Sequence, residues 1–110
     1  MSKYNSEKTE RDGVVFDSKR EAERYDELKL LQRAGEISEL QRQVPFILQE
    51  GFRKNGYKFS PLKYVADFVY KDKNGKTVVE DVKGFATDVY RIKRKIFEHE
   101  FPDLTIMEVR

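Results

Sequence analysis

The sequence contains no cysteine and a single histidine, His99. Without cysteine the chain forms neither disulfides nor thiolate metal sites, which fits a reducing compartment. One histidine excludes zinc sites that need several imidazoles. No apolar run approaches the roughly 20 residues of a membrane span, and the N-terminus has no hydrophobic signal core. We therefore expect a cytoplasmic protein with no membrane partner.

Charge is nearly balanced along the 110 residues, with 22 basic and 20 acidic side chains. A net charge of +2 does not by itself indicate a nucleic-acid partner. Apolar residues make up 38% of the chain, and eight Phe and six Tyr supply much of a modest core. Such a core leaves room for stabilisation by a second copy, so a homodimer is plausible. We predict a flexible leader over 1–12 and a single domain over 13–110.

The hydrophobic pattern predicts an α/β fold (an α+β mixed sheet) in the order helix, three strands, helix, strand. A capping box starting at Ser18 begins a helix over 18–34, and Thr87 or Asp88 caps a second helix that ends near Glu100. The second helix is expected to bury a stripe made by Val89, Ile92, Ile96 and Phe97. Predicted strands are 13–16, 44–49, 64–70, 77–83 and 104–109, with a connector over 36–40. The helix between the last two strands permits a parallel crossover, so the sheet is predicted to be mixed.

Acidic residues occupy both strands of the hairpin that these ranges predict. Asp67 lies in the middle of the first strand, and Asp81 and Lys83 close the second. Because side chains alternate across a strand, Asp81 and Lys83 share one face and Glu80 points away. On the same rule Asp67 lies opposite the face that carries Tyr64, Ala66, Phe68 and Tyr70.

The length of the hairpin loop decides whether the two aspartates meet. A two-residue loop, 74–75, would turn them to opposite faces, whereas a three-residue loop, 73–75, pairs them directly. The three-residue form is a type I turn followed by a left-handed glycine. It therefore requires positive φ at Gly75 and pairs Asp72 with Lys76.

Two carboxylates on paired strands repel each other, and a divalent metal would remove the penalty. Mg²⁺ suits a few carboxylate oxygens with water and phosphate, and Mn²⁺ is expected to substitute. Such a metal would activate a water, while Lys83 could orient it or stabilise the developing charge. The competing interpretation is a solvated strand face with a local ion pair. The valines beside both acids weaken that interpretation, because an unpaired charge is costly in apolar surroundings.

Glu21 is the third acid of interest, and two interpretations of it stay open. It is the fourth residue of the capping box, so its carboxylate could reach back to the Ser18 amide. It could equally serve as a metal or water ligand near the start of the helix.

Basic residues follow the hairpin on the second helix, namely Arg91, Lys93, Arg94 and Lys95. Arg91 and Lys95 lie one turn apart, so they are the first candidates for phosphate contacts, which give affinity without sequence information. The alternative is a solvated basic face. Further cations could extend a basic surface along the sheet: Arg42, Arg53, Lys54, Lys58 and Lys63.

Three segments taken together resemble the PD-(D/E)xK nuclease superfamily, and within it a group of small phage and prophage proteins known as a domain of unknown function. These segments are 16–22, 64–68 and 80–84. The resemblance covers roughly 14–101 and implies a restriction-endonuclease-like core. Ala66 stands where a proline often precedes the first acid.

The resemblance also implies roles for the site residues. Asp67 and Asp81 would bind the metal, Glu21 would be the upstream acid, and Lys83 would be the catalytic lysine. A bulge in the second strand would exchange Asp81 for Glu80. The resemblance further implies that the helix after the lysine adds a basic or polar residue to the site.

These observations favour a Mg²⁺-dependent DNA endonuclease in phage DNA metabolism. Branched DNA such as a Holliday junction is a reasonable substrate, and a resolvase would act as a twofold dimer. One alternative is a non-catalytic module that binds nucleic acid or a protein partner on the same fold. A third, weaker alternative is a toxin-like RNA nuclease.

Overall fold

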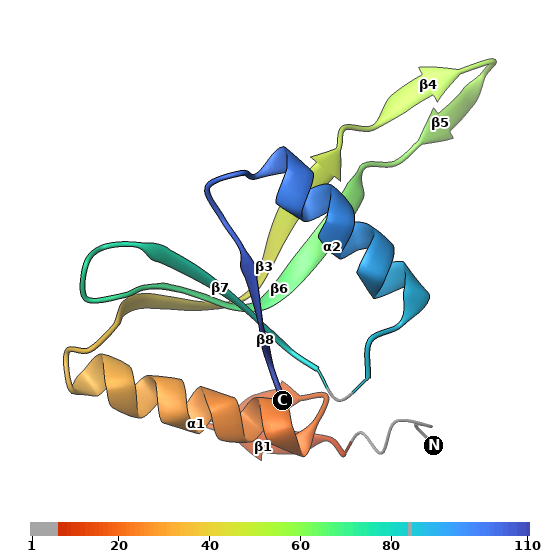
Figure 1. Ribbon diagram of the computed structural model, residues 1–110. Coiled ribbons are helices and arrows are strands. Elements are labelled where there is room, and N and C mark those ends of the chain that lie inside the picture. Colours follow the sequence, from red (N-terminus) through yellow and green to blue (C-terminus); the bar gives the residue numbers. More distant parts are fainter. Residues whose placement is uncertain (1–6, 84) are drawn as a thin grey trace.

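The computed structural model describes residues 7–83 and 85–110 (Figure 1). Its central sheet has the strand order β3-β6-β7-β8, in which β7 and β8 run parallel and the other neighbours antiparallel. The mixed α/β architecture confirms the predicted fold class and is consistent with a restriction-endonuclease-like fold. The elements are β1 (Thr9–Arg11), β2 (Val14–Phe16), α1 (Lys19–Arg33), β3 (Ser38–Gln49), β4 (Phe52–Lys54), β5 (Tyr57–Phe59), β6 (Leu62–Lys71), β7 (Thr77–Val82), α2 (Asp88–Glu100) and β8 (Ile106–Val109).

Two segments predicted to be irregular form strands. Part of the predicted leader, Thr9–Arg11, pairs with β2, so the leader prediction was wrong there; residues 1–6 lie outside the described residues. The predicted connector over 36–40 was also wrong, because β3 already begins at Ser38. β1 and the first half of β3, up to residue 43, were missed because they have few apolar residues; the predicted strand over 44–49 is the second half of β3. β3 is an edge strand, and Pro45 is tolerated there because it has no amide to donate to a further strand.

The sheet separates two hydrophobic clusters, one under each helix (Figure 1). The α1 cluster consists of Phe16, Ala22, Leu28, Phe68 and Tyr70. The α2 cluster consists of Leu48, Tyr64, Ala66, Val79, Tyr90, Phe97 and Ile106. The predicted stripe on α2 was wrong in its first half, because Val89 and Ile92 are 62% and 61% exposed. Tyr90 turns inward in their place, and Phe97 is fully buried as expected.

Strand β6 changes the face of its buried side chains at Asp67. Tyr64 and Ala66 belong to the α2 cluster, whereas Phe68 and Tyr70 belong to the α1 cluster. A regular strand would put all four on one face, so the predicted alternation was wrong here. On β3, Gln43 lies opposite Asp67 and has a φ of 53°. The two strands therefore depart from regular geometry together, and Asp67 lies where they do so.

The hairpin between β6 and β7 has the predicted three-residue loop. Gly75 has a φ of 79°, and the Asp72 amide donates to the Lys76 carbonyl at 2.9 Å, so both predictions are confirmed. The Asp72 carboxylate stabilises the turn by accepting from the Asn74 and Lys76 amides, each at 2.9 Å. The register pairs Phe68 with Glu80, and extending it by one residue places Asp67 across from Asp81.

Candidate active site

Asp81 is a buried carboxylate, 3% exposed, that contacts Tyr64 and Lys83. The Tyr64 hydroxyl donates to Asp81 Oδ2 at 2.6 Å. Lys83 Nζ lies 3.1 Å from Asp81 Oδ1, but the direction of approach does not make a hydrogen bond. Within the described residues, Oδ1 is thus a buried acceptor with no hydrogen-bond partner. The site therefore contains one buried carboxylate oxygen that pairs with a lysine but accepts no hydrogen bond.

The ring of Tyr90 supports the lysine. Lys83 Nζ lies 4.1 Å from the centre of that ring, a cation–π contact. The Tyr90 hydroxyl in turn donates to Glu108 on β8 at 2.8 Å. Lys83 is therefore held between an acid on its own strand and an aromatic ring on α2.

Gln43 joins the other two acids. Its Nε2 atom lies 3.4 Å from Asp67 Oδ1 and 3.4 Å from Glu21 Oε2. Asp67 is fixed further by the Val82 amide, which donates to Oδ2 at 2.7 Å. Sequence reasoning missed Gln43, because its place opposite Asp67 depends on a strand that starts earlier than expected.

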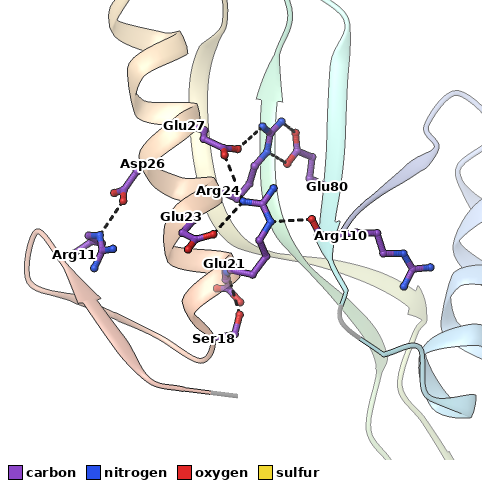
Figure 2. A network of polar contacts seen from close by, with 10 residues as sticks. Arg11, Ser18, Glu21, Glu23, Arg24, Asp26, Glu27, Glu80 and Arg110 are labelled. Atoms are coloured by element: carbon purple, nitrogen blue, oxygen red, sulfur yellow. Dashed lines mark hydrogen bonds and ion pairs between the residues drawn. The ribbon is translucent and has the colours of Figure 1, made fainter. Parts of the chain in front are cut away.

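Glu21 serves the helix cap with its backbone and faces the site with its side chain. Its amide donates to Ser18 Oγ at 3.1 Å, which is half of the predicted capping box (Figure 2). Its carboxylate is 7% exposed and lies beside Gln43. The cap and the placement near the site are therefore compatible.

Burial and mutual repulsion raise the pKa values of two of the acids. Burial, reinforced by the negative charge of Asp67, raises the pKa of Glu21 to about 7. Burial, reinforced by Asp81, raises the pKa of Asp67 to about 6. Burial and Asp81 also raise the pKa of Tyr64, so its hydroxyl stays a donor. The acids interact strongly enough that a bound cation would lower their free energy.

Glu80 lies on the opposite face of β7, where Arg24 and Tyr70 donate hydrogen bonds to its carboxylate. It is 0% exposed and accepts from Arg24 Nε at 2.8 Å and Arg24 Nη2 at 2.7 Å (Figure 2). The Tyr70 hydroxyl also donates to it. Glu80 thus points toward α1, as the alternation of side chains predicted, and Asp81 is the acid that shares a face with Lys83.

A basic pocket of about 490 Å³ lies on the other side of Tyr90. Its lining residues are Ala86, Tyr90, Arg91, Arg94, Lys95, Glu108 and Arg110. Three of the four cations predicted on α2 therefore reach one hollow, and Lys93 is not among them. Arg94 pairs with Glu108 at 2.8 Å, and Arg91 pairs with Asp88 at 3.1 Å.

Comparison with known families gives one match. A family model described as "Protein of unknown function (DUF1064)" matches residues 1–110. The chain belongs to the DUF1064 family. No curated protein and no solved structure matches it. In the described part of this DUF1064 chain, neither helix combines the length and apolar character needed to cross a membrane.

The acids of the candidate site differ in how well they are placed to hold a divalent metal. Across residues 7–83 and 85–110, no three acidic, histidine or cysteine side chains are grouped closely enough to hold a metal. Glu21 therefore does not complete a three-acid site in this geometry. A site with two acids, Asp67 and Asp81, is the simpler arrangement, because Mg²⁺ is often bound by one or two carboxylates with water and phosphate completing the shell. Asp81 Oδ1 has no hydrogen-bond donor among the described residues but is buried beside Lys83, so a cation would have to displace the lysine to reach it.

The raised pKa values predict that the metal-free DUF1064 protein loses stability as pH rises. An acid whose pKa is higher in the folded state stabilises the fold below its unfolded pKa and loses that contribution as pH passes the folded value. The window runs from 4.5 to about 7 for Glu21 and from 3.8 to about 6 for Asp67. For Glu21 the change is on the order of 3 kcal/mol, at about 1.36 kcal/mol per pKa unit. Denaturant unfolding in EDTA at about pH 5 and pH 8 measures it.

The variant Asp67→Asn provides the control for this pH dependence. It removes one interacting charge, so it is expected to raise stability in EDTA near pH 8 and to reduce the slope with pH. Added Mg²⁺ should stabilise the wild type more near pH 8 than near pH 5, because protonated carboxylates bind metal poorly. Glu27 and Glu108 do not reverse this trend between pH 5 and pH 8, because hydrogen bonds from Arg24 and from Tyr90, respectively, lower their pKa values from the ordinary value. Stability that rises from pH 5 to pH 8 in EDTA would contradict the coupled-acid site.

Proposed function

We propose that this protein is a Mg²⁺-dependent DNA endonuclease of the PD-(D/E)xK superfamily. The observation that carries the proposal is that two groups lie beside the buried Asp81. Asp67 accepts from the amide of the next residue, Val82, at 2.7 Å, and Lys83 Nζ lies 3.1 Å from Asp81 Oδ1. Buried, mutually repelling carboxylates beside a lysine are costly for a strand to maintain as structure alone. Metal-dependent phosphodiester hydrolysis uses all three groups.

Each side chain has a distinct task in this proposal. Asp67 and Asp81 would hold Mg²⁺ or Mn²⁺, which when bound polarises the phosphate and supplies an activated water. Lys83, fixed by Asp81 and the Tyr90 ring, stabilises negative charge that develops on the phosphate oxygens. Glu21, whose pKa lies near neutrality, can take a proton from the attacking water at its carboxylate.

The basic pocket on α2 supplies contacts to the DNA backbone. Arg91 and Lys95 are exposed at its rim and Arg94 lies deeper, so phosphates next to the cleaved bond can enter it. Lys93 would add charge from outside the pocket. Such contacts hold the substrate without reading its sequence.

The resemblance to small phage proteins supports branched DNA, such as a Holliday junction, as the substrate in the cytoplasm of an infected host. A junction has two equivalent strands to cut, so the active form would be a twofold homodimer. This part of the proposal rests on the resemblance and on the small core rather than on the geometry of the site.

A binding module without catalysis is the second candidate, and one observation favours it. Lys83 already lies against Asp81 in a site that lacks a closed three-acid cluster. The protein would then hold DNA on the same basic surfaces and leave the phosphodiester bond intact.

Cleavage assays separate the two candidates. We expect the wild type to cut linear, nicked or four-way DNA in Mg²⁺ and in Mn²⁺, with no cutting in EDTA and faster cutting of the four-way junction. RNA of the same sequence serves as the comparison substrate. DNA binding without cleavage in either metal would overturn the enzyme proposal in favour of the binding module.

A further inference from the structure

The strands β4 and β5 form a separate ribbon that projects away from the sheet (Figure 1). We call residues 51–61 the arm. Its two strands are joined by Asn55 and Gly56, both with positive φ (52° and 79°), as in a tight two-residue hairpin loop. All six strand residues are exposed, and each strand packs mainly on the other.

The base of the arm is closely packed. A Cβ atom on Gly51 would lie 2.9 Å from the Phe59 carbonyl oxygen and 3.1 Å from Pro61 Cδ. Only glycine fits this approach without a shift of the backbone. The backbone contact at Gly51 therefore helps to set the direction in which the arm projects.

The two faces of the arm differ in chemistry. One face carries Phe52 and Phe59, stacked with their ring centres 4.7 Å apart and nearly parallel, and continues to the pair of Lys54 and Tyr57 near the tip. The other face carries the cross-strand pair Arg53 and Lys58. The aromatic stack braces a ribbon that would be marginal alone.

All charged side chains in the arm and in residues 62–66, which follow it, are positive. Residues 51–66 contain no aspartate or glutamate and include four cations: Arg53, Lys54, Lys58 and Lys63. Removing these four would change the net charge of the chain from +2 to −2. This region therefore carries a local charge of +4, equal to that of the segment 91–95 on α2, and such a one-signed patch points to a polyanion as the partner.

We propose that the arm is a second DNA-binding element, which grips duplex DNA away from the candidate active site through Arg53, Lys54 and Lys58. A two-stranded ribbon has the width to enter a major groove, and side-by-side cations contact the phosphates at its edges. This inference rests on the proposed function. It adds a second binding contact, with the duplex that flanks the cleaved bond. It predicts that substrates need duplex beyond the few nucleotides that the pocket on α2 covers.

The test removes three charges from the arm and three from elsewhere. The arm variant is Arg53→Ala, Lys54→Ala, Lys58→Ala, which keeps the phenylalanine stack and the turn. The matched control is Arg33→Ala, Lys73→Ala, Lys76→Ala, whose side chains are exposed at or near the other end of β6. Binding to a duplex of about 30 base pairs is measured in EDTA over a range of salt concentrations by fluorescence anisotropy.

The arm variant is expected to bind at least about tenfold more weakly, with a salt slope reduced by about 2–3, since each phosphate contact contributes about 0.9. The control should change both by much less. Equal losses in the two variants would mean diffuse attraction and would overturn the proposal. An unchanged affinity for the arm variant would also overturn it, as would conversion of a dimer to a monomer in sedimentation, which would make the arm a self-association element.

A small substrate keeps this result separate from the fate of the proposed function. Cleavage of bis(4-nitrophenyl) phosphate in Mn²⁺ requires the candidate active site. The compound itself is too small to reach the arm. The arm variant is expected to cleave it at the wild-type rate. If neither protein cleaves it while the binding difference persists, the enzyme proposal fails and the arm proposal stands.

Discussion

Replacing Lys83 with alanine is expected to lower kcat for DNA cleavage by about 10²–10³-fold, the usual effect of removing one group that stabilises transition-state charge. The lysine is held 3.1 Å from Asp81 and 4.1 Å from the centre of the Tyr90 ring, so its ammonium has a defined position before substrate arrives. Such preorganisation is the condition under which a single charge has a large effect on rate. Single-turnover cleavage of a labelled junction in saturating Mg²⁺ gives the measurement.

Lys95→Ala is the matched control for this experiment. Lys95 lines the basic pocket but is not placed against the aspartates, so its loss should raise KM and leave kcat nearly unchanged. Melting temperature in Mg²⁺ shows whether Lys83→Ala is folded, since the variant leaves Asp81 without its neighbouring cation. A folded Lys83→Ala protein that cuts within threefold of the wild-type rate would remove Lys83 from the proposed mechanism.

Replacing Arg24 with alanine is expected to lower the free energy of unfolding by about 3–5 kcal/mol, as when one partner of a buried ion pair is removed. Its guanidinium makes two hydrogen bonds to Glu80, which is 0% exposed (Figure 2). Without Arg24, Tyr70 would remain as the donor to Glu80 among the described residues, and the buried carboxylate would have lost its cation. Urea unfolding near pH 7 measures the loss.

Arg20→Ala tests whether burial is the cause. Arg20 lies one turn earlier on α1 and pairs with Glu23 and Glu27, both about half exposed. Exposed pairs contribute about 0–1 kcal/mol, so this variant should lose far less. The double variant Arg24→Met, Glu80→Leu should recover much of the stability, because a buried pair can be replaced by apolar side chains of similar size. Equal losses for Arg20→Ala and Arg24→Ala would contradict the assignment.

The sequence alone could predict the features that depend on residues close together in the chain, namely the helix caps and the hairpin turn. The caps at Ser18 and Thr87 and the turn at Gly75 depend on bonds between residues at most four apart, and each has the predicted form. The register of the hairpin follows from that turn, so the pairing of Phe68 with Glu80, one position from Asp67 and Asp81, was also accessible. The order of the two helices and of the sheet strands β3, β6, β7 and β8 followed from hydrophobic periodicity, whereas β1, β4 and β5 were not predicted.

Long-range packing is what the sequence alone could not predict. Arg24 looks like an exposed helix residue until α1 is placed against β7, 56 positions along the chain. Gln43 and Tyr64 reach the acids only because β3 and β6 depart from regular geometry at Asp67. The buried face of α2 was misassigned by one position, because an amphipathic tyrosine can lie inside when its hydroxyl has an acceptor such as Glu108.

The adjacent acids of β7 have a consequence for how the site is assembled. Glu80 and Asp81 are one peptide bond apart and face opposite helices, so sliding β7 by one residue would exchange them. The salt bridge to Arg24 opposes that slip, because it accepts only the residue that faces α1. Arg24 therefore fixes the register of β7 in the sheet. A helix residue outside the candidate site thus determines which of the two adjacent carboxylates lies beside Lys83.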